Sequence, residues 1–147
     1  MKRKSVALLL ALLTGAFGFS ACNKDTDGNW SYQITKSVSG DTVLVEIRID
    51  EKGEDAFLLD VMNKAKEEGE LTFELSGGML VSMEGYANDA DFNPCWMLYT
   101  SDEELSNTEW GTVIMGERTL GSAILGAEAL PIEEGESYVW SYVHFSE

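Results

Sequence analysis

The hydrophobic period of the chain changes between residues 42 and 65, and no other feature limits the fold as much. From Thr42 to Ile49 apolar and polar residues alternate, which predicts a β-strand with one packed face and one face in water. The next apolar residues recur at helical spacing, which predicts an amphipathic helix, and they are Leu58, Val61, Met62 and Ala65. One helix among several strands predicts an α+β domain in which the helix lies across a sheet.

Turn and cap residues set the predicted limits of these elements. Residues 39–41 (Ser-Gly-Asp) predict a hairpin turn before the alternating strand. Asp55 is the predicted N-cap of the helix, and Gly69 is its predicted C-terminal stop. Residues 100–109 predict an acidic loop, and the glycine-rich residues 119–131 predict an irregular connection. The other predicted strands are Trp30–Val38, Leu71–Leu75, Met79–Met83, Trp96–Tyr99, Val113–Met115 and Tyr138–Tyr142.

The N-terminal residues predict export. A basic start at residues 2–4 is followed by an apolar run and then by small residues directly before Cys22. This pattern is typical of a secretory signal peptide, and it is too short for a membrane-spanning helix. The segment around Cys22 resembles the lipobox of bacterial lipoproteins, with Phe19 in place of the usual leucine. It therefore predicts a signal peptide over residues 1–21, lipidation of Cys22 and attachment to the outer face of the cell membrane. The alternative is an ordinary cleaved signal that leaves Cys22 as a free or disulfide-bonded thiol.

Charge and cysteine content narrow the possible partners. The chain has a net charge of −16 at pH 7, and removal of the signal would make it more acidic. Such a charge repels nucleic acid and anionic lipid headgroups. Polar residues 22–29 predict a short tether, which leaves residues 30–147 as one domain. If Cys22 carries lipid, Cys95 has no cysteine partner, and we expect it to be a small buried hydrophobe.

The sequence offers little catalytic chemistry. His144 is the single histidine and has no nucleophile at motif spacing, so no catalytic residue and no metal site are predicted. The acidic runs at residues 102–104 and 133–136 are interpreted as solvated faces. Residues 25–29 and 89–93 each resemble part of a calcium loop, but both lack the closing acidic residue, so only a weak surface calcium site stays open.

Three segments, in order, resemble the transcobalamin-like C-terminal domain family. They are the helix Leu58–Gly69, the strand Trp96–Tyr99, and the turn Pro131–Glu136 leading into Tyr138–Tyr142. The similarity spans roughly residues 42–145. It implies a β-grasp-like mixed sheet with one main helix packed across it, and a ligand site at strand ends and loops on one side. The implied ligand is a corrinoid, bound without a resident cofactor.

The resemblance also implies site residues. In transcobalamins the matching Trp strand and the loop after it lie against a corrin ring, which assigns ligand contact to Trp96, Leu98 and Tyr99, with Trp110 as a loop contributor. Large amphipathic side chains of this kind are common at ligand and partner sites. The alternative is that Trp96 and Leu98 belong to the core. Two departures weaken the match: the chain lacks the helical domain that supplies a histidine to cobalt, and Thr100-Ser101-Asp102 replaces the Asn-Gly turn found in bacterial relatives.

These observations favour a non-catalytic cell-surface lipoprotein that binds a corrinoid for uptake, together with a transporter or surface-protein partner. The alternative is an adhesion or assembly module whose aromatic patch binds a protein or a cell-wall glycan. Neither interpretation involves nucleic acid.

Overall fold

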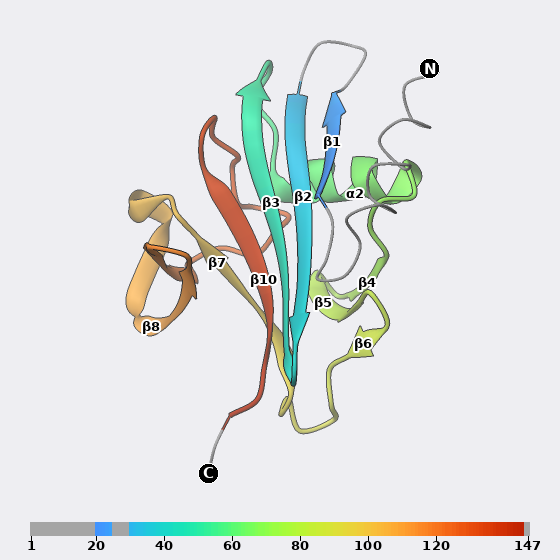
Figure 1. The fold of residues 1–147 in the computed structure, drawn as a ribbon, viewed down its shortest axis with the longest axis vertical. Helices are drawn as coiled ribbons and strands as arrows, with labels where there is room; N and C mark the ends of the chain where they lie inside the picture. Colours follow the sequence, from blue (N-terminus) through green and yellow to red (C-terminus); the bar gives the residue numbers. More distant parts are fainter. Residues whose placement is uncertain (1–19, 25–29, 146–147) are drawn as a thin grey trace.

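A computed structural model describes residues 20–24 and 30–145, and the fold is α+β with a large antiparallel sheet (Figure 1). The seven strands of this sheet have the order β1-β2-β3-β10-β7-β9-β8, and β4, β5 and β6 form a second, three-stranded sheet. In chain order the elements are β1 (Ser20–Lys24), β2 (Trp30–Ser39), β3 (Thr42–Lys52), α2 (Leu58–Glu67), β4 (Phe73–Ser76), β5 (Met79–Met83), β6 (Tyr86–Ala87), β7 (Cys95–Thr100), the 3-10 helix η1 (Glu103–Leu105), β8 (Ser106–Met115), β9 (Arg118–Ala123) and β10 (Ser137–Val143).

The expectation of a mixed sheet is wrong, because every described strand pair is antiparallel. Short turns join β2 to β3 and β8 to β9, and such turns produce antiparallel neighbours. β3 and β7 are both antiparallel to β10, which lies between them. The centre of the sheet is therefore completed by the last strand in chain order (Figure 1).

The helix α2 forms as its period predicts and covers one face of the large sheet. Its four apolar residues at helical spacing are all fully buried. Gly69 ends the helical segment with a φ of +78°, as expected. Asp55 is not the N-cap: Phe57 occupies that position, and its N–H donates to the Asp60 carboxylate at 2.9 Å. Asp55 instead forms an ion pair with Lys52 at 3.2 Å.

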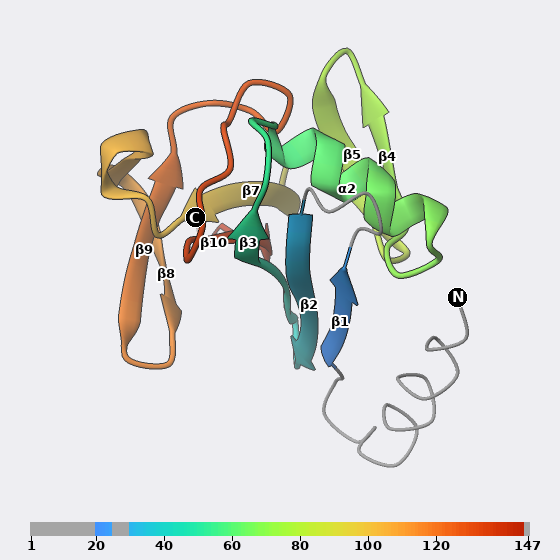
Figure 2. The same ribbon diagram turned by 90° about the horizontal axis from the view of Figure 1, so that it is seen from above.

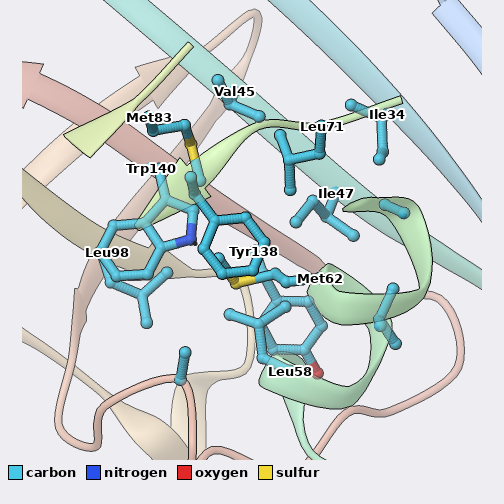
Figure 3. Close-up of a cluster of buried hydrophobic side chains, with 14 of the residues drawn as sticks. Ile34, Val45, Ile47, Leu58, Met62, Leu71, Met83, Leu98, Tyr138 and Trp140 are labelled. Carbon is cyan, nitrogen blue, oxygen red and sulfur yellow. Dashed lines mark hydrogen bonds between the residues drawn. The ribbon is translucent and has the colours of Figure 1, made fainter. Parts of the chain in front are cut away.

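The main core lies between the large sheet and the layer formed by α2, β4 and β5 (Figures 2 and 3). Trp140 from β10 lies against Met62 of α2, and its indole N–H points at the Met62 sulfur at 3.4 Å. Leu98, Leu58 and Tyr138 surround this pair. Burial of aromatic and branched side chains from both layers is the main source of stability.

A second, smaller cluster lies on the opposite face of the sheet. The hairpin β8–β9 carries Leu120 against Tyr99 of β7 and Val139 of β10. The predicted irregular connection is wrong over residues 119–123, which belong to β9, and the predicted acidic loop is partly η1 and partly β8. Gly121 is needed within β9, because a Cβ there would lie 3.1 Å from the side chains of Ser106 and Thr108.

Candidate functional site

The four side chains expected to face a ligand do not share one surface. Trp96 and Leu98 are 5% and 8% exposed and belong to the main core. Tyr99 is 6% exposed and points to the opposite face, where burial raises the pKa of its hydroxyl. Trp110, on β8, is 62% exposed. The alternative interpretation of Trp96 and Leu98 as core therefore holds, because both faces of β7 are covered, one by α2 and one by the hairpin β8–β9.

Trp96 contributes to an aromatic cluster at the far end of β7 and β10. The Tyr142 ring lies 5.1 Å from Trp96, 5.5 Å from Tyr86 and 5.6 Å from His144, measured between ring centroids. The indole N–H of Trp96 donates to the Tyr86 carbonyl at 2.7 Å. These contacts satisfy the polar end of Trp96 inside the domain.

A cleft of about 500 Å³ lies at the other end of these strands, where β7 ends and β10 begins. One wall is the segment after the Trp strand, Ser101–Leu105, and the other is the turn before β10, Pro131–Glu136. The volume is within the range of about 300–1,000 Å³ that is typical of small-molecule sites. Antiparallel pairing brings the two walls together, since Thr100 is the register partner of Tyr138.

Hydrogen bonds fix the first wall. The Ser101 hydroxyl accepts from the Ser137 N–H at 2.8 Å and donates to the Glu136 carboxylate at 2.8 Å. Asp102 caps η1, because its carboxylate accepts from the Glu104 N–H at 3.1 Å. The Ile124 N–H donates to the Leu105 carbonyl at 3.0 Å, which ties the end of η1 to the end of β9. The wall is therefore preformed.

The second wall is held from the core side. The Tyr138 hydroxyl accepts from the Glu133 N–H at 2.8 Å and donates to the Pro131 carbonyl at 3.3 Å. Burial raises the pKa of Tyr138, and the negative charges of Asp102 and Glu136 raise it further, so this hydroxyl stays protonated. The turn is also joined to β3, because the Gly135 N–H donates to the Ile49 carbonyl at 2.8 Å.

The cleft is strongly acidic. Its lining includes the carboxylates Asp102, Glu103, Glu104, Glu133 and Glu136, together with apolar surface from Leu105 and Pro131. Lys52 lies at the rim, where its ammonium group donates to the Glu133 carboxylate at 3.1 Å and forms an ion pair with Asp55. These two interactions raise the pKa of Lys52. The cleft therefore presents hydrogen-bond acceptors to a ligand, next to a small apolar surface.

Sequence reasoning interpreted the two acidic runs as solvated faces and missed that they converge. The available signal is their position, since one run follows a predicted strand and the other precedes one. Only the pairing of these two strands, which the sequence does not show, brings the runs together. Within the described residues, no group of three or more His, Cys, Asp or Glu side chains has the arrangement of a metal site. The proposed calcium fragment at residues 25–29 lies outside the described residues, and residues 89–93 form a turn in which the Phe92 N–H donates to the Asp89 carbonyl at 2.9 Å.

The two cysteines lie in different strands of the large sheet. Cys95 is a free, buried thiol, as expected, and burial raises its pKa. The backbone of Cys22 lies in β1, at the edge of the large sheet, where it is the register partner of Gln33. Residues 22–24 of the expected tether are therefore paired strand, and residues 25–29 lie outside the described residues. No helix in the described part of the chain has the length and apolar character needed to cross a membrane.

The described residues form an α+β domain with a large antiparallel sheet and a preformed, acidic cleft at the junction of β7 and β10. In comparisons with known proteins, no family model, no curated protein and no solved structure matches this chain.

Proposed function

We propose that this chain is a non-catalytic, lipid-anchored protein of the cell surface whose transcobalamin-like domain binds a corrinoid in the acidic cleft for uptake. One observation carries the proposal: the cleft lies between the segment after the Trp strand and the Pro131–Glu136 turn. The Pro131–Glu136 turn is one of the places where the sequence resembles the transcobalamin-like family. The segment after the Trp strand directly follows another such place, although its own first residues depart from the family. The ligand site is thus proposed at the loop after the Trp strand and not on the strand itself.

The chemistry of the cleft suits such a ligand. Corrin rings carry amide groups around their periphery, and amide N–H groups donate to carboxylates. Glu103, Glu104 and Glu136 offer these acceptors, while Leu105 and Pro131 offer apolar contact to the ring. The cleft covers only part of a ligand of this size, and a transporter or surface protein is proposed to cover the rest.

A β-grasp-like relation is part of the same proposal. Two features support it: α2 follows the hairpin β2–β3 and packs across the sheet, and the last strand, β10, is inserted beside β3 in the centre. The antiparallel direction of β10 relative to β3 departs from the mixed sheet that the resemblance implies.

The position of the proposed anchor, Cys22, leaves the cleft accessible to a ligand. Cys22, Gln33, Arg48 and Ser137 are successive register partners across β1, β2, β3 and β10. At a strand spacing of about 4.8 Å, the anchor is about 14 Å from the cleft, at the same level of the sheet. A lipid at the β1 edge therefore holds the domain by its side and leaves the cleft accessible.

The test is calorimetric titration of the full chain, in nonionic detergent, with cobinamide as the corrinoid. Glu103→Gln combined with Glu104→Gln should weaken binding about three- to tenfold, the usual effect of losing one or two hydrogen bonds. The matched control is Glu109→Gln combined with Glu117→Gln, which makes the same charge change on exposed residues outside the cleft. Absence of heat with the wild-type chain at about millimolar cobinamide, or equal weakening by both double variants, would contradict the proposal.

A second candidate function, adhesion or assembly with another macromolecule, is favoured by Trp110. This side chain is 62% exposed on β8 and does not line the cleft.

A further inference from the structure

Strand β8 is one edge of the seven-stranded sheet, and its outer side has no strand partner among the described residues. Exposed edges attract further strands, and proteins commonly block them with lysine or proline. The β8 sequence, SNTEWGTVIM, contains neither residue and no arginine. The regular end of this edge, residues 112–115, is available for strand addition.

Strand β8 carries exposed side chains within and after its irregular segment. Thr108 and Trp110 are exposed between Asn107 and Thr112, where the register shifts, and Thr112 and Ile114 are exposed after it, while Val113 and Met115 pack against the smaller core cluster. Trp110 is 62% and Ile114 is 70% exposed, the two highest values among the exposed large hydrophobic residues of the described chain. Threonine, isoleucine and tryptophan are strand-favouring residues that form cross-strand pairs.

The last part of β8 is regular enough to accept a partner strand. A bulge between Asn107 and Thr112, with Gly111 at a φ of +142°, separates this part from the beginning of the strand. Residues 112–115 then pair without interruption with residues 118–121 around a two-residue turn. In such a hairpin only every second residue directs its backbone N–H and C=O groups at the partner strand, so those of Thr112 and Ile114 point to the free side.

The edge is held in place by contacts across the sheet. Arg118, at the hairpin tip, donates to the Glu46 carboxylate of β3 at 3.0 Å and to the Ser137 hydroxyl at 3.2 Å. Leu120 is buried against Tyr99 and Val139 beneath the hairpin. A partner strand would meet a preformed edge, which lowers the entropic cost of binding.

The charge around the edge indicates the kind of partner. Exposed carboxylates lie before the strand, within it and in its turn, at Glu103, Glu104, Glu109 and Glu117. The nearby Arg118 is engaged with Glu46. A second copy of this chain, with its net charge of −16, would be repelled at this edge, whereas a basic segment would be attracted.

We infer that β8 is a docking edge for a basic polypeptide segment that binds in extended conformation and adds a strand to the sheet. The peptide groups of Thr112 and Ile114 pair with its backbone, Ile114 pairs with its apolar side chains, and Trp110 receives a lysine or arginine over its ring. This inference deepens the assembly function by naming its partner class, and it is independent of corrinoid binding.

The test uses a fluorescein-labelled nonapeptide of alternating lysine and valine, titrated with the full chain in nonionic detergent and followed by fluorescence anisotropy. Ile114→Lys should weaken binding about tenfold or more, since it places a like charge on the edge. The matched control is Val38→Lys, the same type of change on a 55% exposed residue at the far end of β2, and it should have little effect. Trp110→Ala should weaken binding, while Phe92→Ala, at an exposed loop residue, should not.

A second peptide, with proline in place of every valine, keeps the charge but cannot pair as a strand, and its binding should be lost. Equal binding of the two peptides would overturn the inference, as would equal effects of Ile114→Lys and Val38→Lys. The inference would also be overturned if the chain bound no peptide but self-associated, and Ile114→Lys abolished that self-association. The partner at β8 would then be a second copy of this chain. Cobinamide titration of the Ile114→Lys variant separates the two proposals, because its heat should equal that of the wild-type chain.

Discussion

Replacement of Tyr99 by alanine tests whether this side chain of the Trp strand packs in the core or contacts a ligand. The Tyr99 ring is 6% exposed and packs between Leu120 and Val139. The backbone of the hairpin lies over it, since a Cβ on Gly111 would be 3.8 Å from the ring. Truncation of a buried aromatic side chain to alanine costs about 3–5 kcal/mol, and this covered site has little freedom to collapse.

That loss is a large fraction of the roughly 5–15 kcal/mol by which a domain of this kind is stable. Tyr99→Ala should therefore lower the melting temperature by about 10–20 °C, measured by circular dichroism. Two control variants show whether the loss of stability comes from removing the buried ring. Tyr99→Phe keeps the ring and should cost less than about 1 kcal/mol. Trp110→Ala removes an exposed ring and should change stability by no more than about 0.5 kcal/mol. A Tyr99→Ala variant that melts like the wild-type chain would refute the assignment of Tyr99 to the smaller core cluster.

Three further predictions follow from other sites. Val61→Asp puts an unpaired charge on the fully buried face of α2, which should cost several kcal/mol and leave the chain unfolded in a thermal melt; an unchanged melting temperature would contradict the helix packing. Burial opposes ionisation of Glu84, but hydrogen bonds from Lys36 and Thr72 outweigh it and lower the Glu84 pKa. The stability from Glu84 is therefore fully present at neutral pH and is lost progressively as the pH falls from 4.5 through its lowered pKa. Glu84→Gln should lower the melting temperature at pH 7, and this difference should shrink steadily as the pH falls below 4.5; a difference that does not change with pH would argue against this ion pair. Cys22→Ser should release the protein into the medium and abolish fatty-acid labelling, whereas unchanged membrane association would exclude lipid at Cys22.

Local patterns in the sequence predicted the local elements. The apolar spacing of α2 and the alternation in β3 reappear as the buried faces of those elements, because each element has one packed side. The glycine pattern is misleading at β9, where Gly121 predicts irregular structure. Its actual reason is the close approach of Ser106 and Thr108 from the facing strand, which no local pattern encodes.

The site was less predictable than the elements. Alternation assigns Trp96 and Tyr99 to opposite faces of β7, but it does not say that both faces are covered. That depends on where the hairpin β8–β9 folds back, a contact between segments far apart in the sequence. The acidic cleft has the same origin: the two runs of carboxylates meet only because β7 pairs with β10, and periodicity does not identify strand partners.

The central place of β10 has a consequence for the order of folding during synthesis. Residues 137–143 fill the gap between β3 and β7, so neither strand has its inner neighbour until this late segment arrives. Because synthesis proceeds from the N-terminus, the sheet cannot close until the chain is almost complete. Until then both inner edges and the apolar face of α2 are open to aggregation. Truncation before residue 137 would leave two halves of a sheet and no folded domain.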